Sequence, residues 1–231
     1  MSFLQPYISR LLPMFEELDD NFRKISRIHG REVTCKAGCD DCCHYPFDIR
    51  LVEAVYICEG VRELAAPLRS EVRRRAAEAM EQLRAKDSSD DTLTRGEMTR
   101  EDMARRTLMM SGIRVPCPAI VDRNCAIYGH RPGICRIFGV PLTIVRGQPA
   151  VSCAMCGFKP NSQYVSFVMT DFLTHLDDVD RQLMTDLAGR PPATAFRTSI
   201  AAAICVDYDV EKVRRVAVRL AGEPTAAAAS C

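Results

Sequence analysis

Apolar side chains near the start of the chain recur at steps of three and four positions, from Phe3 to Ile28. This spacing puts them on one face of a helix, so the segment predicts an amphipathic helix whose apolar face packs on a core. Ser2 is the expected N-cap of this helix and Gly30 its expected stop, while Pro13 is a candidate position for a kink.

The next apolar pattern follows an irregular segment, residues 31–47. A second helix is predicted from near Asp48, and it contains Cys58, which is expected to be a small buried hydrophobic side chain. A third helix, over residues 68–86, is highly charged, and its run of arginines predicts a solvated face. The polar residues 87–98 predict a mobile linker.

The rest of the chain has an irregular centre followed by more helices. A helix is predicted between Thr99 and Gly112, and short apolar runs within residues 137–151 predict two short strands around a turn. From about Ser162 the helical spacing returns. It predicts three helices, at residues 162–188, 193–205 and 208–221.

The composition narrows the class of protein. The chain has 231 residues and a formal net charge of +1, so it lacks the basic excess that is typical of nucleic-acid-binding proteins. It contains no run of about 18 apolar residues that could span a membrane, and residues 1–10 do not resemble a secretory signal. We therefore expect a cytoplasmic protein with no nucleic-acid or membrane partner. In that reducing compartment, 12 cysteines predict metal or redox chemistry rather than disulfides.

Nine of the 12 cysteines fall in two loop-like stretches, and these nine are the candidate metal ligands. The first four lie within nine residues, where Gly38 permits a tight turn that lets several thiolates point at one centre. Cys58 and Cys205 fall in predicted helices and Cys231 in the C-terminal tail, so these three are assigned no role. The candidate ligands are Cys35, Cys39, Cys42, Cys43, Cys117, Cys125, Cys135, Cys153 and Cys156.

The number and order of these cysteines leave the nature of the metal centre open. Neighbouring side chains point in opposite directions in an extended chain, so Cys42 and Cys43 are not expected to bind one mononuclear ion together. Nine thiols also exceed the four that one zinc ion or one cubane cluster needs. Two centres, one polynuclear centre bridged by both residues, and one centre with spare thiols all fit this pattern. Candidates for charge balance or hydrogen bonding to sulfur are Lys36, His44, Arg123, Arg131 and Arg136.

We expect a single domain, residues 1–231, with a cysteine-cluster core at 35–156 and helical flanks at 1–34 and 160–225. The predicted fold class is mainly α with a small irregular or β cysteine-rich centre, in which helices flank a metal-binding loop core. The spacing Cys35-x3-Cys39-x2-Cys42 alone is similar to the cluster loop of radical S-adenosylmethionine enzymes. Those enzymes alternate strands with helices, whereas here helix follows helix.

The order of several short motifs resembles the bacterial cysteine-cluster proteins of the YkgJ type, a family described as a zinc- or iron-chelating domain. The resemblance covers about residues 35–156 and implies metal chelation by these cysteines. The first gap here encloses three residues, where the family often has two. The flagellin lysine N-methylase, a relative of the family, adds an enzyme hypothesis by analogy. The matching pieces are the Cys35/Cys39/Cys42/Cys43 group, Cys117-Pro118, Cys125-Ala-Ile-Tyr128, Arg131-Pro132 and Cys135-Arg136-Ile-Phe138.

Other residues near these motifs have local interpretations. Pro132 restricts the chain before Cys135 and thereby presents this cysteine to a metal. Tyr128 is expected to be half-buried in the core, with packing against the site as the alternative. His44 and His130 are weaker ligand candidates, because His130 is not at a tight ligand spacing from the neighbouring cysteines.

Three functions remain open from the sequence. The leading hypothesis is an iron–sulfur protein whose [4Fe–4S] cluster serves electron transfer, redox sensing or modification chemistry. The first alternative is structural zinc, held by the Cys39/Cys42 and Cys153/Cys156 pairs in a module that binds a protein or peptide partner. The second is a metalloenzyme that modifies a protein or peptide. The sequence contains no phosphate loop, nucleophile elbow or zinc-protease motif, and it names no catalytic residue.

Overall fold

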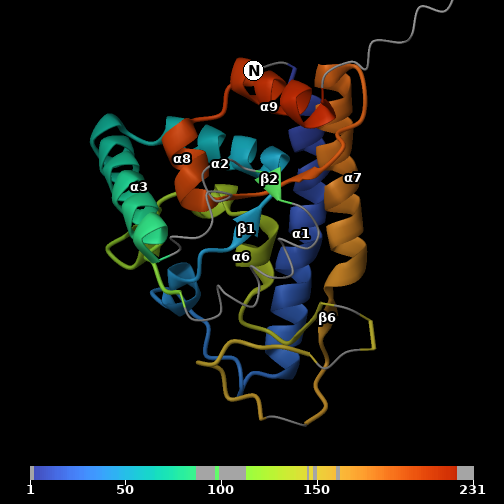
Figure 1. Cartoon of the computed structure of the whole chain (residues 1–231). Coiled ribbons are helices and arrows are strands. Elements are labelled where there is room, and N and C mark those ends of the chain that lie inside the picture. Colours follow the sequence, from blue (N-terminus) through green and yellow to red (C-terminus); the bar gives the residue numbers. More distant parts are fainter. Residues whose placement is uncertain are drawn as a thin grey trace, which may run out of the picture.

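The computed structural model describes residues 3–86, 97–98, 113–144, 146–147, 150–159 and 162–222. These residues are mainly helical (Figure 1), so the predicted predominance of helix is confirmed. Within the described residues, no helix combines the length and the apolar composition needed to cross a bilayer. The helices described are α1 (Gln5–Ile28), α2 (Leu51–Glu63), α3 (Ala66–Lys86), α6 (Gly133–Ile137), α7 (Met169–Ala188), α8 (Ile200–Val206) and α9 (Val210–Ala221).

Strands of two residues each pair in four small sheets within the described part of the chain. Sheets of this size form no layer of their own, so helix packing builds the core. Three pairs are antiparallel: β1 (Asp48–Ile49) with β8 (Thr198–Ser199), β2 (Glu97–Met98) with β7 (Ala195–Phe196), and β3 (Ile120–Val121) with β4 (Asn124–Cys125). The fourth pair, β5 (Leu142–Thr143) with β6 (Phe167–Val168), is parallel.

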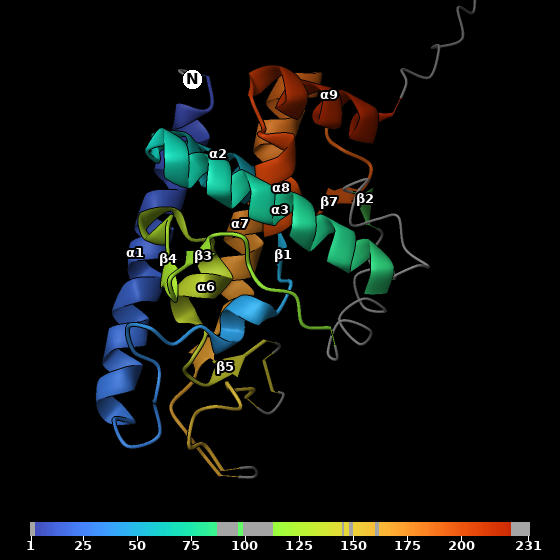
Figure 2. The ribbon, with the colours of Figure 1, turned by 90° about the vertical axis from the view of Figure 1, so that its left-hand side faces the viewer.

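The long helices α1 and α7 lie side by side (Figures 1 and 2). The predicted apolar face of α1 is confirmed, because Leu11, Phe15 and Leu18 are buried. The start of α1 differs from the prediction, since the helix begins at Gln5 with Leu4 as its N-cap. The expected N-cap, Ser2, lies outside the described residues.

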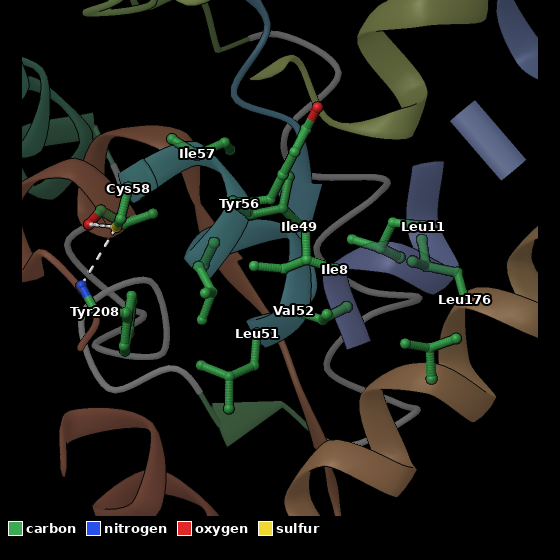
Figure 3. Close-up of a cluster of buried hydrophobic side chains, with 14 of the residues drawn as sticks. Ile8, Leu11, Ile49, Leu51, Val52, Tyr56, Ile57, Cys58, Leu176 and Tyr208 are labelled. Carbon is green, nitrogen blue, oxygen red and sulfur yellow. Dashed lines mark hydrogen bonds between the residues drawn. The ribbon is translucent and has the colours of Figure 1, made fainter. Parts of the chain in front are cut away.

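The helix α2 lies at the centre of the core. Every residue from Leu51 to Cys58 is buried, because apolar side chains surround this helix instead of lining one face. Figure 3 shows these side chains packed with residues of α1 and α7. As predicted, Cys58 is a buried side chain. Its thiol donates a hydrogen bond to the carbonyl oxygen of Ala203 and accepts one from the amide of Tyr208, both at 3.3 Å.

The charged helix α3 has the predicted solvated face. Arg74 on this face is exposed and forms ion pairs with Glu71 and Glu78. The neighbouring Arg75 differs, because its guanidinium also donates to the carbonyl oxygen of Ile120 in β3 at 2.8 Å. One residue of the arginine run therefore fixes the β3–β4 hairpin to α3.

Several predicted boundaries are wrong by a few residues, because short strands precede the helices. α2 starts at Leu51 rather than near Asp48, since Asp48 and Ile49 pair with β8. In the same way, α7 starts at Met169 rather than 162, and α8 at Ile200 rather than 193. The residues directly before α7 belong to β6, and those before α8 belong to β7 and β8.

Two irregular regions, residues 137–151 and the expected linker at 87–98, agree with the prediction only in part. Leu142 and Val151 exchange two backbone hydrogen bonds of 2.7 and 2.8 Å, as the predicted strands around a turn require. However, β5 is only two residues long and also pairs with β6, which the sequence did not indicate. In the expected linker, residues 97–98 form β2, whereas residues 87–96 lie outside the described residues, as does the predicted helix at 99–112.

Two buried carboxylates, those of Glu53 and Asp180, hold the starts of two helices. Asp180 of α7 accepts a 2.8 Å hydrogen bond from the amide of Val52, in the first turn of α2. Glu53 accepts from the amide of Arg50 at 3.0 Å and from that of Gly133, the first residue of α6, at 2.9 Å. The amides at the start of a helix have no hydrogen-bond acceptor inside that helix. The two carboxylates therefore fix α6 and α7 to α2.

Replacing Asp180 should change how stability depends on pH. Burial raises the pKa of Asp180 from 3.8 to about 7. Between pH 3.8 and about pH 7, the carboxyl group of Asp180 is therefore protonated in the folded chain and ionised in the unfolded chain. The wild type therefore loses stability as the pH rises through this window. Asp180→Asn keeps an oxygen for the Val52 amide but does not titrate. Urea unfolding should show the wild type losing stability relative to Asp180→Asn as the pH rises, and parallel curves would contradict this. Asp178→Asn, exposed on the same helix, is the control.

A methyl group at Gly133 should be poorly tolerated. A Cβ atom there would lie 2.3 Å from Cζ of Phe172 and 3.3 Å from Cδ1 of Leu18, so α6 sits directly against α7 and α1. Overpacking of this kind costs about 1–3 kcal/mol. We expect Gly133→Ala to lower the free energy of unfolding by that amount in urea titrations. Gly129→Ala is the matched control, since no atom lies within 4 Å of its Cβ position, and equal losses in both variants would show that this packing does not matter.

Candidate metal centre

The two cysteine-bearing loops meet at the C-terminal end of α1 (Figures 1 and 2). The amide of Gly157 donates to the carbonyl oxygen of Glu32 at 2.7 Å. The hydroxyl of Thr34 donates to the carbonyl oxygen of Met155 at 2.8 Å, across 121 residues of sequence. These bonds bring the segment before Cys35 against the segment that carries the last two candidate ligands.

A tight turn places Cys39, as the sequence predicts. Gly38 has a φ of +82°, a conformation that glycine adopts without strain. The amide of Cys39 donates to the carbonyl oxygen of Lys36 at 2.9 Å and closes this turn. The turn thereby positions Cys39 and Cys35 along the wall of the same pocket.

Five of the nine candidate ligands line one pocket, which we call the thiol pocket. Its cysteines come from both loops, so the structure brings together the two Cys-x2-Cys pairs, Cys39/Cys42 and Cys153/Cys156. The space has a volume of about 240 Å³, part of it open to solvent. The lining cysteines are Cys35, Cys39, Cys42, Cys153 and Cys156.

The thiols of this pocket favour their protonated form in the absence of a cation. Burial raises the pKa of Cys35 to about 11, and the neighbouring thiols of Cys39, Cys42, Cys156 and Cys153 add to this effect. Burial raises the pKa of Cys153 in the same direction. Several thiolates can therefore exist together here only if a metal compensates their charge.

Cys42 and Cys43 do not have the extended conformation that the sequence suggested. They lie in a 3₁₀ helix, η1 (Asp41–His44), so their side chains are not forced to opposite sides. The thiol of Cys42 donates to that of Cys43, and this hydrogen bond, together with burial, strongly raises the pKa of Cys42. The assumption of an extended chain is therefore wrong for this pair, whereas the expectation that Cys42 and Cys43 do not bind one ion together stays a prediction, since Cys42 lines the thiol pocket and Cys43 does not.

The other four candidate ligands do not line the thiol pocket. One is Cys43, and we call the remaining three the inner thiols. They are Cys117, Cys125 and Cys135, and the first two pack against the main hydrophobic core. The amide of Cys117 donates to the carbonyl oxygen of Cys43 at 2.7 Å, which joins this group to the first loop. Burial raises the pKa of Cys117 to about 12 and that of Cys135 well above its usual range.

Of the predicted cations, Arg131 is the one near the inner thiols, and its charge lowers the pKa of Cys125 and Cys135 against the effect of burial. Its guanidinium donates to the carbonyl oxygen of Cys135 at 3.2 Å and stacks 3.6 Å from the ring centre of Tyr128. Tyr128 is 63% exposed, so its expected burial in the core is wrong. The tyrosine instead covers Arg131 at the surface.

Arg136 has a structural role. It is buried, donates to a carboxylate oxygen of Asp19 at 2.7 Å and to the carbonyl oxygen of Gly129 at 2.6 Å, and lies over the ring of Phe15. The same aspartate pairs with Arg131 at 3.6 Å. These contacts bind the residues on both sides of Cys135 to α1.

The remaining predicted residues do not line the thiol pocket. Lys36 is exposed, and Arg123 is exposed with an ion pair to Asp40 at 3.5 Å. Nδ1 of His44 lies 3.0 Å from the carbonyl oxygen of Asp40. His130 packs its ring 4.7 Å from that of Tyr56 on α2.

The donor set of the thiol pocket suits a soft metal, because sulfur ligands select zinc or iron–sulfur clusters. Within the part of the chain that the structure describes, no group of three or more His, Cys, Asp or Glu side chains is arranged to hold a metal ion. The five thiols therefore share a pocket without converging on one point. Metal binding would draw the loops at 35–42 and 153–156 closer together.

Sequence reasoning missed three residues of the pocket wall, Thr34, Gly139 and Met155. The hydroxyl of Thr34 lies 3.7 Å from the sulfur of Cys156, and that thiol donates to the carbonyl oxygen of Gly139 at 3.3 Å. No spacing rule points to these residues, because they act through the backbone or through a neighbour far along the chain. The position of Thr34 directly before Cys35 is the only signal that the sequence offers.

Comparisons of the chain with models of protein families, with curated proteins and with solved structures found no match. The resemblance to the YkgJ-type family therefore remains an expectation from the motifs.

Loss of the Asp19 carboxylate should destabilise the segment that carries Cys135. Asp19→Asn removes the charged partner of the buried Arg136, and hydrogen bonds to charged groups contribute about 1.5–3 kcal/mol. We expect a loss of that size in the free energy of unfolding, measured in urea. Asp20→Asn is the neighbouring control, because the pair of Asp20 with Arg23 is exposed and should contribute less than about 1 kcal/mol. An equal loss of stability in both variants would show that the ion pair between Asp19 and Arg136 does not stabilise this segment.

Proposed function

We propose that the thiol pocket holds an iron–sulfur cluster of the [4Fe–4S] type, which the protein uses in redox or modification chemistry. One observation carries the proposal: five cysteines from two loops that are far apart in the sequence line a single pocket. Such a cluster takes four cysteine thiolates, so the pocket offers enough sulfur donors. The motif resemblance to a zinc- or iron-chelating family supports the same conclusion.

The cluster would supply one-electron chemistry, and hydrogen bonds to its sulfur ligands would help to set its reduction potential. The chain offers one such donor, the backbone amide of Met155, whose hydrogen bond to Cys153 lowers the pKa of that thiol against the effect of burial. The hydroxyl of Thr34 lies 3.7 Å from the sulfur of Cys156 but donates its proton to the carbonyl oxygen of Met155.

The position of both Cys-x2-Cys pairs in one pocket also favours a second candidate, structural zinc. Cys39, Cys42, Cys153 and Cys156 would form a closed site of four thiolates. The protein would then be an interaction module, and its helical flanks would contact a protein or peptide partner. A metalloenzyme that modifies a protein or peptide is the remaining alternative.

Each of these functions fits a reducing compartment, and we propose the cytoplasm. Metal binding needs thiolates, which disulfide formation would consume. All cysteines in the described part of the chain are free thiols.

The metal content of cysteine variants tests the proposal. The wild type, purified without oxygen, should be brown and contain about four iron and four sulfide per chain. Cys39→Ser and Cys156→Ser should each lose colour, iron and sulfide and lower the melting temperature as well, because metal-binding energy is folding energy at such sites. Iron and sulfide are measured colorimetrically, and stability by thermal unfolding.

Cys205→Ser is the control, since this exposed thiol lies outside the pocket. A colourless wild type with stoichiometric zinc would replace the iron–sulfur proposal by the zinc candidate. Unchanged metal content in both pocket variants would exclude the thiol pocket as the site.

A further inference from the structure

A second pocket of the structure, which we call the proline pocket, shares no lining residue with the thiol pocket. It has a volume of about 300 Å³, part of it open to solvent. Four segments form its wall: residues 45–47, the helix α3, residues 115–118 and the junction of β8 with α8. These segments are far apart in the sequence, so the pocket is a product of the tertiary fold.

The wall of the proline pocket is held in place without a ligand. Three of its residues are prolines, and the ring of a proline fixes one backbone dihedral angle. The amide of Val115 donates to the carbonyl oxygen of His44 at 2.9 Å and joins the two loops of the wall. In the helical part of the wall, α3 packs against α8, and the small side chains of Ala79 and Ala201 line the space. A preformed site of this kind loses little free energy to ordering when a ligand binds.

The composition of the wall favours an uncharged ligand with a ring. Two aromatic residues, Tyr45 and Phe47, line the pocket, and the flat face of a ligand ring can pack on such side chains. The described residues of the wall include no charged side chain. Arg114 lies 4.7 Å from the ring centre of Tyr45 but does not line the pocket, and its charge is paired with Asp41. A charged ligand would therefore lose its hydration without gaining a counter-charge.

One hydroxyl group in the wall makes a weaker hydrogen bond than it could. Ser199 lines the pocket and is only 2% exposed. Its oxygen accepts from the amide of Ala202 at 3.1 Å, and its proton is directed at the thioether sulfur of Met80, at 3.8 Å. A thioether sulfur is a weak acceptor. A carbonyl oxygen that reached this hydroxyl would give it a stronger hydrogen bond.

The proline pocket is connected to the thiol pocket through two aromatic rings. Phe47 lines the proline pocket and Phe138 lines the thiol pocket, and their ring centres lie 5.3 Å apart. A ligand that packs on Phe47 is therefore separated from the thiol pocket by one pair of packed rings.

We propose that the proline pocket is a binding site for a small, uncharged molecule that has one ring and a carbonyl oxygen, and that this oxygen accepts a hydrogen bond from Ser199. Pockets for drug-sized ligands have volumes of about 300–1,000 Å³, so this pocket is at the small end and suits one ring rather than a large cofactor. The site goes beyond the proposed function and needs no metal. Its test is therefore independent of whether the thiol pocket holds a cluster.

Three probes of similar shape test the chemistry of the site. They are acetophenone, α-methylstyrene, in which a CH₂ group replaces the carbonyl oxygen, and benzoate, which is charged. Dissociation constants are measured by NMR titration of the whole chain. The wild type should bind the two neutral probes and not benzoate. Ser199→Ala should weaken the binding of acetophenone about 2–10-fold, the equivalent of one hydrogen bond, and leave that of α-methylstyrene unchanged. An equal effect on both neutral probes, or benzoate binding as tight as that of acetophenone, would overturn the inference.

A pocket-filling variant tests the location of the site. The larger side chain of Ala79→Leu should occupy the pocket and abolish the binding of both neutral probes. Ala77→Leu is the matched control, since Ala77 is exposed on the same helix and does not line the pocket. The control should bind both probes like the wild type. Unchanged binding in Ala79→Leu, or an equal loss in both variants, would place the probes elsewhere and overturn the inference.

A measurement on the wild type covers the case in which these variants do not fold. The methyl-bearing residues Leu83, Val115 and Ile200 line the pocket, and their methyl groups report on it in NMR spectra. Acetophenone should shift these three sets of signals until they saturate, and it should leave the signals of Leu11 on α1, which does not line the pocket, in place. The absence of saturable shifts at the three residues would overturn the inference.

Discussion

The hydrogen bonds that Glu53 and Asp180 accept from the first amides of α2 and α6 are the interaction on which the rest of the structure depends. Both carboxylates are only 2% exposed, and a buried carboxylate without partners would be strongly unfavourable. Here each accepts backbone amides that a helix start leaves unpaired. Close by, Arg50 and Arg197 share Asp177, at 2.7 and 2.9 Å, and complete the charge balance around α7.

This arrangement affects the position of Cys135, because Glu53 accepts a hydrogen bond from the amide of Gly133, two residues before that cysteine. The α6 helix has only five residues, too few to be stable alone. It is held from one side by Glu53, from another by Asp19 through Arg136, and by packing against α1 and α7. Contacts with α1, α2 and α7 therefore hold the short helix that carries Cys135. The thiol pocket, in contrast, is built from irregular chain that a few hydrogen bonds join.

The sequence predicts the helices well where their apolar spacing is long and regular, as in α1, α3 and α9. It fails at Met169 and Ile200, because the apolar residues before them pair with distant strands, and local spacing contains no information on such partners.

For the candidate site, the first loop and its turn at Gly38 followed from residue types alone. The division of eight of the nine cysteines between the thiol pocket and the inner thiols did not, because it depends on which loop folds against which. The conformation of Cys42 and Cys43 could not be predicted from the sequence either, because a 3₁₀ helix of four residues is too short to produce a periodic pattern.

The contact between Thr34 and Met155 spans 121 residues, and this separation has a consequence for biosynthesis. At 5–20 residues per second, the ribosome completes the second loop about 6–24 s after the first. During that interval, the four thiols of residues 35–43 are exposed without the cysteines that complete their pocket. If the pocket holds the cluster proposed above, it cannot be loaded before the second loop has been synthesised, and the thiols of the first loop would need protection from oxidation during that interval.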